Sequence, residues 1–212
     1  MIQSQAASCS EKMKISRRAG KSFPLTQQSP TRMMKAMPAK RANHNPPRRP
    51  TVGSGLTLQS AEMTLREYAP ADFDVLHQLD RICYPRGIAY SKRTLRWFLA
   101  QRGAICLIAE INSKIAGFIL ADQQARAAHI VTIDVAPGER RHGVGTVMMA
   151  EVEKRLAALG VREIYLETAT NNAAGAAFWQ RLGFHTVGLM AGYYLGRQDA
   201  YAMAKRLADH SP

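Results

Sequence analysis

The chain has 212 residues, 46% of them hydrophobic, and its 29 Lys and Arg outnumber its 16 Asp and Glu to give a formal net charge of +13. No apolar run approaches the roughly 18 residues that a membrane-spanning helix needs, so the sequence predicts a soluble protein. The three cysteines, Cys9, Cys83 and Cys106, form no CxxC pair. Their number and spacing argue against a disulfide scaffold or a zinc site and favour a reducing, cytoplasmic location.

Most of the positive charge lies in residues 1–62. This segment carries eleven basic and two acidic side chains, whereas residues 63–212 carry eighteen and fourteen. It is rich in Ser, Gln and Pro, so we expect a disordered basic extension before a domain at 63–212. Four explanations stay open: an arm that touches RNA or ribosomes, a cleaved transit segment, a linker, or an extension from a miscalled start codon. The last is favoured because Met63 opens an alternating strand pattern.

From residue 63 the apolar patterns alternate between strand and helix periods, which is typical of an α/β domain. In chain order they predict a strand at 64–68, a helix from about Pro70, in its first turn, to about 83, a helix at 92–102, strands at 105–110, 115–121 and 129–135, a helix at 143–159, a strand at 163–168, a helix at 172–182, and strands near 186–193 and 200–205. Ser91 is the expected N-cap of the second helix, and Asn112-Ser-Lys114 is a hairpin signal. Six apolar residues should form the buried face of the long helix: Val144, Val147, Met148, Val152, Leu156 and Leu159.

The segment Arg140-Arg-His-Gly-Val-Gly-Thr146 joins a strand to the start of the longest helix. Free backbone N–H groups at a helix start, with the positive end of the helix dipole, form a site for a pyrophosphate. The glycines let a ligand approach, and the two arginines add positive charge. From the residues alone, an ordinary helix start with solvent-facing arginines stays open. The segment is neither a Walker loop nor a dinucleotide-binding fingerprint.

This segment resembles the Gln/Arg-x-x-Gly-x-Gly/Ala acetyl-CoA motif of the GNAT family of N-acetyltransferases. Downstream, Asn172-Ala-Ala-Gly-Ala-Ala-Phe-Trp-Gln-Arg-Leu-Gly-Phe184 resembles that family's second motif, Asn-x-x-Ala-x-x-Leu-Tyr-x-x-x-Gly-Phe. The resemblance covers 63 to about 207. It implies a mixed α/β fold with a mostly antiparallel sheet of about seven strands, flanking helices, and a cleft for acetyl-CoA between the fourth and fifth strands.

The resemblance also assigns cofactor-binding residues. The pantetheine arm would lie beside Ile133, Asp134 and Val135, and Asn172 would hydrogen-bond to it. The pyrophosphate would be held by Arg141, His142, Gly143, Val144, Gly145 and Thr146. From the residues alone, Ile133 and Val135 are equally typical of a core strand and Asn172 of a helix N-cap.

For catalysis, the resemblance places a general base at Glu167, acting through water, although an alternating strand would also present a plain solvent-facing Glu there. Trp179 occupies the position of the Tyr that usually protonates the leaving thiolate, and an indole N–H is not a usable acid near neutral pH. Tyr193, Tyr194 and Tyr84 would line the groove for the acceptor peptide. The alternative for the tyrosine pair is a surface aromatic strand end.

The ending Gly192-Tyr-Tyr-Leu-Gly-Arg-Gln-Asp-Ala-Tyr-Ala-Met203 resembles the ribosomal-protein alanine N-acetyltransferases of the RimI type. This implies acetyl transfer to the N-terminal alanine of a protein, with a ribosomal protein as the expected partner. Two alternatives stay open: a lysine or small-amine acetyltransferase, and a catalytically impaired relative that binds RNA or ribosomes. No metal is expected, because His129 and His142 have no partner pattern and are interpreted as structural or surface residues. Nucleic acid would be contacted only through the basic tail.

Overall fold

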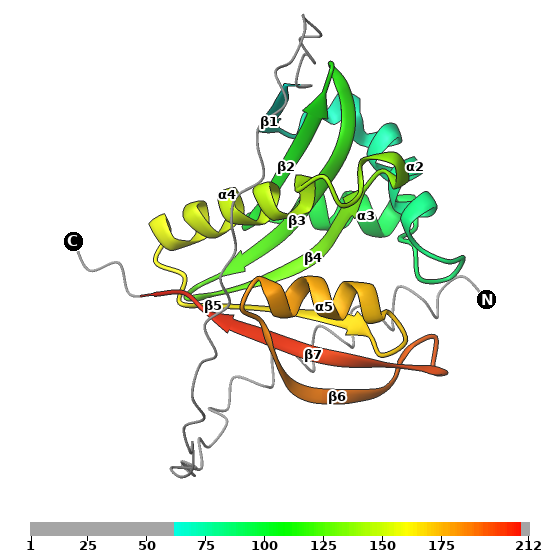
Figure 1. The fold of residues 1–212 in the computed structure, drawn as a ribbon, viewed down its shortest axis with the longest axis vertical. Coiled ribbons are helices and arrows are strands. Elements are labelled where there is room, and N and C mark those ends of the chain that lie inside the picture. The colour runs from blue at the N-terminus through cyan, green and yellow to red at the C-terminus, as the bar shows by residue number, and fades with distance from the viewer. Residues whose placement is uncertain (1–61, 209–212) are drawn as a thin grey trace, which may run out of the picture. The chain divides into compact units, whose positions relative to one another are not determined.

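The computed structural model describes residues 62–208, so the predicted disorder of the basic extension lies outside the described residues except for Glu62. The described part contains a seven-stranded sheet in the order β1-β2-β3-β4-β5-β7-β6 (Figure 1). The strands are β1 (Met63–Glu67), β2 (Ala104–Ile111), β3 (Lys114–Gln124), β4 (Ala127–Val135), β5 (Glu163–Ala169), β6 (His185–Tyr194) and β7 (Gln198–Arg206). The helices are α2 (Phe73–Cys83), α3 (Lys92–Leu99), α4 (Val144–Ala158) and α5 (Ala173–Arg181), with short 3-10 turns η1 (Pro70–Asp72) and η2 (Pro137–Glu139).

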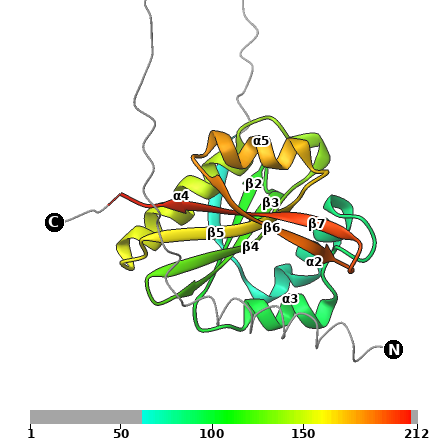
Figure 2. The ribbon, with the colours of Figure 1, turned by 90° about the horizontal axis from the view of Figure 1, so that it is seen from below.

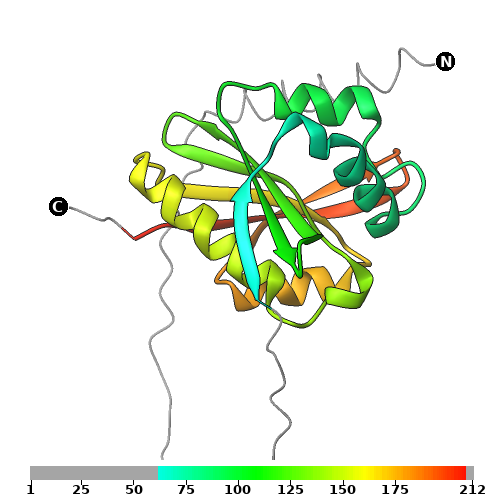
Figure 3. The ribbon, with the colours of Figure 1, turned by 90° about the horizontal axis from the view of Figure 1, so that it is seen from above.

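Helices cover both faces of the sheet. Figures 2 and 3 show α4 and α5 over one face and α2 and α3 over the other. Leu107 and Ile119 are fully buried in the core cluster that includes the α4 side chains, whereas their neighbours Ile108 and Phe118, outside that cluster, are equally buried. Strands covered on both faces are expected to be apolar at successive positions. The apolar runs at 105–110 and 115–121 are therefore confirmed as strands.

The strands β4 and β5 run parallel, whereas every other neighbouring pair in the sheet is antiparallel. They pair only from Ala127↔Glu163 to His129↔Tyr165. From residue 130 to its end at Val135, β4 pairs with β3 alone, and Figure 1 shows the far ends of β4 and β5 apart. The predicted opening between the fourth and fifth strands is confirmed, and the helix α4 begins just beyond the end of β4.

Two details of the predicted helices are wrong. In α4, Val147 and Leu159 are 39% and 58% exposed, and the fully buried Met149 takes a place in the apolar face. In the helical period, Met149 falls at one edge of the buried face of α4 and Val147 falls beyond the other edge. Leu159 is the C-cap residue, where the chain leaves the helix before Gly160, which has a φ of +76°. The helix α3 starts at its predicted cap, where Ser91 Oγ accepts from the Thr94 N–H, but ends at Leu99 instead of 102.

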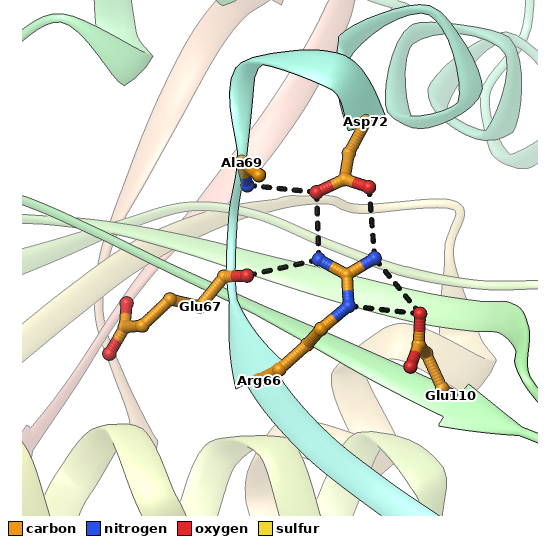
Figure 4. Close-up of polar contacts among 5 residues, drawn as sticks. All are labelled: Arg66, Glu67, Ala69, Asp72 and Glu110. Atoms are coloured by element: carbon orange, nitrogen blue, oxygen red, sulfur yellow. Dashed lines mark hydrogen bonds and ion pairs between the residues drawn. The ribbon is translucent and has the colours of Figure 1, made fainter.

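A partly buried network of ion pairs at the edge of the sheet holds the connection between β1 and α2 (Figure 4). The Arg66 guanidinium donates to both Asp72 oxygens at 2.8 and 2.9 Å and to Glu110 on β2 at 2.9 Å. Asp72 also accepts from the Ala69 N–H at 2.8 Å. The Arg66 hydrogen bond lowers the pKa of Asp72 below 3.8, against the opposing effect of its burial. The network therefore ties α2 to the edge of the sheet.

We expect Arg66→Lys to lower the free energy of unfolding by about 1 kcal/mol, because a lysine cannot make the two-pronged contact and Arg66 is partly solvent-exposed. The pKa of Asp72 is depressed in the folded state, so its contribution is present above pH 3.8 and is lost as the pH falls through the lower folded value. Urea unfolding at neutral pH and near pH 3 measures both effects. A difference between variant and parent that does not shrink at the acidic pH would contradict this assignment.

Candidate active site

The start of α4 presents unpaired backbone donors beyond the end of β4. The first helical hydrogen bond is donated by the Val147 N–H to the Gly143 carbonyl at 3.0 Å, so the N–H groups of residues 144–146 precede the helical ladder. Gly143 is the N-cap at a φ of +84°, and no side chain caps this helix end. Arg141 and His142 are exposed beside it. The geometry is that of an anion site.

The second glycine of the motif has a packing role. A Cβ added to Gly145 would lie 3.2 Å from Cζ of Phe178 on α5 and 3.6 Å from Cδ1 of Ile133 on β4. Because such a side chain would crowd Phe178 and only touch Ile133, the glycine lets α4 and α5 approach each other over β4. Sequence reasoning assigned this glycine only to the approach of the ligand.

Arg140 does not point toward the helix start as the sequence interpretation assumed. Its Nε donates to the Val135 carbonyl at 3.0 Å, and its terminal nitrogen lies 3.4 Å from Cys83 Sγ at the end of α2. The side chain thus joins the end of β4 to α2. Of the two arginines in the motif, Arg141 therefore remains the candidate to bind a phosphate group.

Side chains of the 84–90 loop contact the half of β4 that has no pairing with β5. The Tyr84 hydroxyl donates to the Ile133 carbonyl at 3.4 Å, and the Tyr90 hydroxyl donates to the Val131 carbonyl at 3.2 Å. The predicted groove residue Tyr84 is therefore brought to the same stretch of β4 as the predicted pantetheine residues Ile133 and Val135. Burial raises the pKa of Tyr84 well above its usual value, and the nearby Asp134 charge raises it further, so this hydroxyl stays protonated.

Asp134 contributes to this stretch through its backbone only. Its side chain is fully buried and accepts from Thr132 Oγ1 at 3.1 Å. Burial raises its pKa well above 3.8, and the negative charge of Asp80 on α2 adds to the shift. Asp80 is itself fully buried, which raises its pKa to about 6, and it accepts from the Tyr90 N–H at 2.7 Å. The two carboxyls pin α2 and the following loop against β4.

A His–Glu pair lies where β4 and β5 separate. His129 belongs to the last paired rung, opposite Tyr165, on which its ring stacks at 4.9 Å between centroids. Two residues further along β5, Glu167 Oε2 lies 2.8 Å from His129 Nε2, and both side chains are less than one fifth exposed. Sequence reasoning found Glu167 but missed His129. The 38-residue separation hid the pair, and only the register of the two parallel strands reveals it.

The local environment keeps Glu167 ionised. Burial alone raises the pKa of Glu167, but the hydrogen bond and charge of His129 and the hydrogen bond of Tyr193 outweigh it, so the net pKa lies below 4.5. The Tyr194 hydroxyl donates to the Glu167 carbonyl at 3.4 Å. Burial raises the pKa of Tyr194 to about 12 and that of Tyr193 further. Both predicted groove tyrosines thus stand over Glu167 as hydrogen-bond donors.

Asn172 is the N-cap of α5, which is one of the two roles that the sequence predicted for it. Its Oδ1 accepts from the Gly175 N–H at 3.0 Å, and a Cβ on Gly175 would lie 2.4 Å from the Asn172 amide nitrogen. Its two amide hydrogens remain for a ligand. Its role toward pantetheine stays a prediction.

Trp179 is a core residue. It is 6% exposed and packs edge-to-face with Phe178 and Phe184 at 4.9 and 5.3 Å between ring centroids. A buried indole surrounded by aromatic rings adds no acid to the site, so the residue is interpreted as packing beneath it.

The described residues contain no group of three or more His, Cys, Asp or Glu side chains placed to hold a metal ion. Within residues 62–208, no helix is long and apolar enough to cross a membrane.

Comparisons with known proteins fit this geometry. The profile of the Acetyltransferase (GNAT) family matches residues 73–184. This chain belongs to the GNAT acetyltransferase family. An N-alpha-acetyltransferase of Saccharolobus solfataricus is 26% identical over 159 residues, which cover 69% of this chain and 94% of that protein. The [ribosomal protein bS18]-alanine N-acetyltransferase of Escherichia coli is 32% identical over 96 residues, 44% of this chain and 65% of that enzyme.

The fold comparison agrees. The crystal structure of Arabidopsis thaliana NAA60 in complex with acetyl-CoA superposes with a TM-score of 0.62 at 19% identity, covering 69% of this chain and 99% of that one. The predicted GNAT fold, with its open and mostly antiparallel sheet of seven strands and flanking helices, is confirmed, and the protein is an acetyltransferase.

Proposed function

We propose that this GNAT enzyme transfers the acetyl group of acetyl-CoA to the N-terminal α-amine of a protein, with alanine as the acetylated residue and a ribosomal protein as the candidate target. The observation that carries the proposal is the His129–Glu167 pair at 2.8 Å, placed where β4 and β5 separate. The Saccharolobus relative is named as an N-alpha-acetyltransferase and the Escherichia coli relative as an alanine N-acetyltransferase of a ribosomal protein, and both names support the choice of acceptor. An intact pair favours an active enzyme over a catalytically impaired relative.

The described residues fit acetyl-CoA. The free N–H groups of residues 144–146 and the exposed Arg141 suit the pyrophosphate. The carbonyls of Ile133 and Val135 each accept from protein side chains, and a carbonyl oxygen has a second lone pair for a pantetheine amide. Bound acetyl-CoA supplies a thioester whose carbonyl carbon is open to attack by an amine, with the sulfur leaving as a thiolate.

The modest strength of the base suits a peptide α-amine. At pH 7, removing the proton from an α-amine of pKa about 7.8 costs about 1 kcal/mol, whereas a lysine of pKa about 10.4 costs about 4.6 kcal/mol. Glu167 orients the His129 imidazole, and the pair takes up the amine proton directly or through water. The amine nitrogen forms the new C–N bond as the C–S bond breaks, and water protonates the thiolate, since Trp179 lies in the core.

The test is the turnover of acetyl-CoA by the full chain on an alanine-starting peptide and on the same peptide with a blocked N-terminus. We expect CoA release with the free peptide only. Equal CoA release with both peptides would contradict an α-amine acceptor. Equal CoA release in the absence of peptide would show that the enzyme only hydrolyses acetyl-CoA, which would also contradict the proposal.

A further inference from the structure

Two loops meet beside Tyr84, Tyr193 and Tyr194, the tyrosines predicted to line the groove for the acceptor peptide. The 84–90 loop joins α2 to α3, and its Tyr84 and Tyr90 hydroxyls are anchored on β4. The turn at residues 195–197 joins β6 to β7, and Tyr194, the last residue of β6, anchors it over β5 through its hydrogen bond to the Glu167 carbonyl. Their tips touch, because a Cβ built on Gly87 would lie 2.8 Å from Cδ1 of Leu195. Figures 2 and 3 both show this loop and this turn on the same side of the sheet.

Each tip carries one exposed arginine, Arg86 beside Gly87 and Arg197 two residues after Leu195, and we call them the rim arginines. Neither forms an ion pair with any residue of the described part of the chain. Nearby carboxylates are already engaged.

Four carboxylates lie on the elements around the two tips, and Asp134 on β4 is fully buried. Asp199 Oδ1 accepts from the Gly192 N–H at 2.8 Å, Asp80 is fully buried, and Glu167 is paired with His129. The exposed rim between the loops is therefore positively charged, with two guanidinium groups available to a ligand.

We propose that the preferred acceptor is an N-terminus in which acidic side chains follow the acetylated residue, and that the rim arginines select it. This inference rests on the proposed function. With the α-amine at the His129–Glu167 pair, the following residues must leave past the two loops, advancing about 3.3–3.6 Å per residue. A carboxylate there meets a guanidinium whose planar donors match it, whereas a lysine meets like charge.

The experiment compares kcat/KM of the full chain on three free peptides that share an initial alanine and a neutral C-terminal part. Their second to fourth residues are acidic, neutral or basic. An exposed ion pair changes a binding equilibrium by about two- to fivefold, so two such pairs predict a kcat/KM that is about 4- to 25-fold higher for the acidic than for the neutral peptide. The basic peptide should be the poorest, and the spread should narrow at high salt.

The variant Arg86→Glu/Arg197→Glu should invert this order. The control is Arg126→Glu, which makes the same type of substitution at one exposed turn between β3 and β4, at the opposite end of β4, and it should leave the order unchanged. Because it changes the net charge by half as much as the double variant, Arg86→Glu and Arg197→Glu are each compared with it singly. Equal kcat/KM on all three peptides, or an order that the double variant does not alter, would overturn the inference while leaving N-terminal acetylation intact. Failure to acetylate any free peptide would instead overturn the proposed function and the inference with it.

Discussion

Glu167→Gln is expected to lower kcat by about 100-fold or more while acetyl-CoA binding stays within about twofold, because general-base catalysis contributes a factor of about 10²–10⁴. The amide keeps the shape of the side chain but cannot hold the proton that the His129–Glu167 pair takes from the amine. Stopped-flow or steady-state turnover gives kcat, and calorimetric titration with CoA gives the binding constant.

Glu163→Gln is the matched control, since it makes the same chemical change at the exposed start of the same strand and should leave kcat unchanged. Because the pKa of Glu167 lies below 4.5, its carboxylate is ionised throughout the neutral range. A rise in rate between about pH 6.5 and 8.5 is thus expected from the α-amine, whose pKa is about 7.8. A Glu167→Gln enzyme with parental kcat would remove Glu167 from the mechanism.

Trp179→Ala is expected to lower the free energy of unfolding by about 3–5 kcal/mol, the usual cost of deleting a large buried aromatic side chain. The ring is 6% exposed and packs against Phe178 and Phe184, so its removal leaves a cavity beneath the site. Trp97→Ala is the control. Trp97 is 42% exposed on α3, and its removal should cost about 1 kcal/mol or less.

Trp179→Tyr separates packing from chemistry, because it keeps an aromatic ring and restores the hydroxyl that resembling enzymes carry. We expect a smaller loss of stability and a kcat equal to or above that of the parent. Denaturant unfolding and turnover on the same preparation check both. A folded Trp179→Tyr enzyme whose kcat collapses would show that the indole has a required role of its own.

The sequence predicted the order and type of the elements because each carries a local signal. Ser91 caps α3, and the hairpin turn predicted at Asn112 is formed by Asn112 and Ser113 at positive φ. The opening between β4 and β5 came from the family resemblance, and the strand register confirms it. Boundaries and faces were less secure: Val147 and Leu159 match the apolar period but lie outside the packed face.

The parts of the site that sequence could not predict depend on register and on side-chain direction. His129 becomes a partner of Glu167 only through the short parallel pairing that ends at Tyr165. Arg140 belongs to a phosphate motif by spacing, yet it binds the Val135 carbonyl. A histidine at the point where two parallel strands part is the signal that would have identified the pair.

The proposed reaction is acetylation of a peptide α-amine. It is tested most directly by locating the acetyl group on a product peptide that offers both a free N-terminal alanine and an internal lysine. Mass spectrometry with fragmentation after incubation with the full chain and acetyl-CoA distinguishes the two positions. An α-amine acetyltransferase places the acetyl group on the α-nitrogen and leaves the lysine unmodified. Acetyl on the lysine side chain, with a free α-amine, would contradict the proposed reaction.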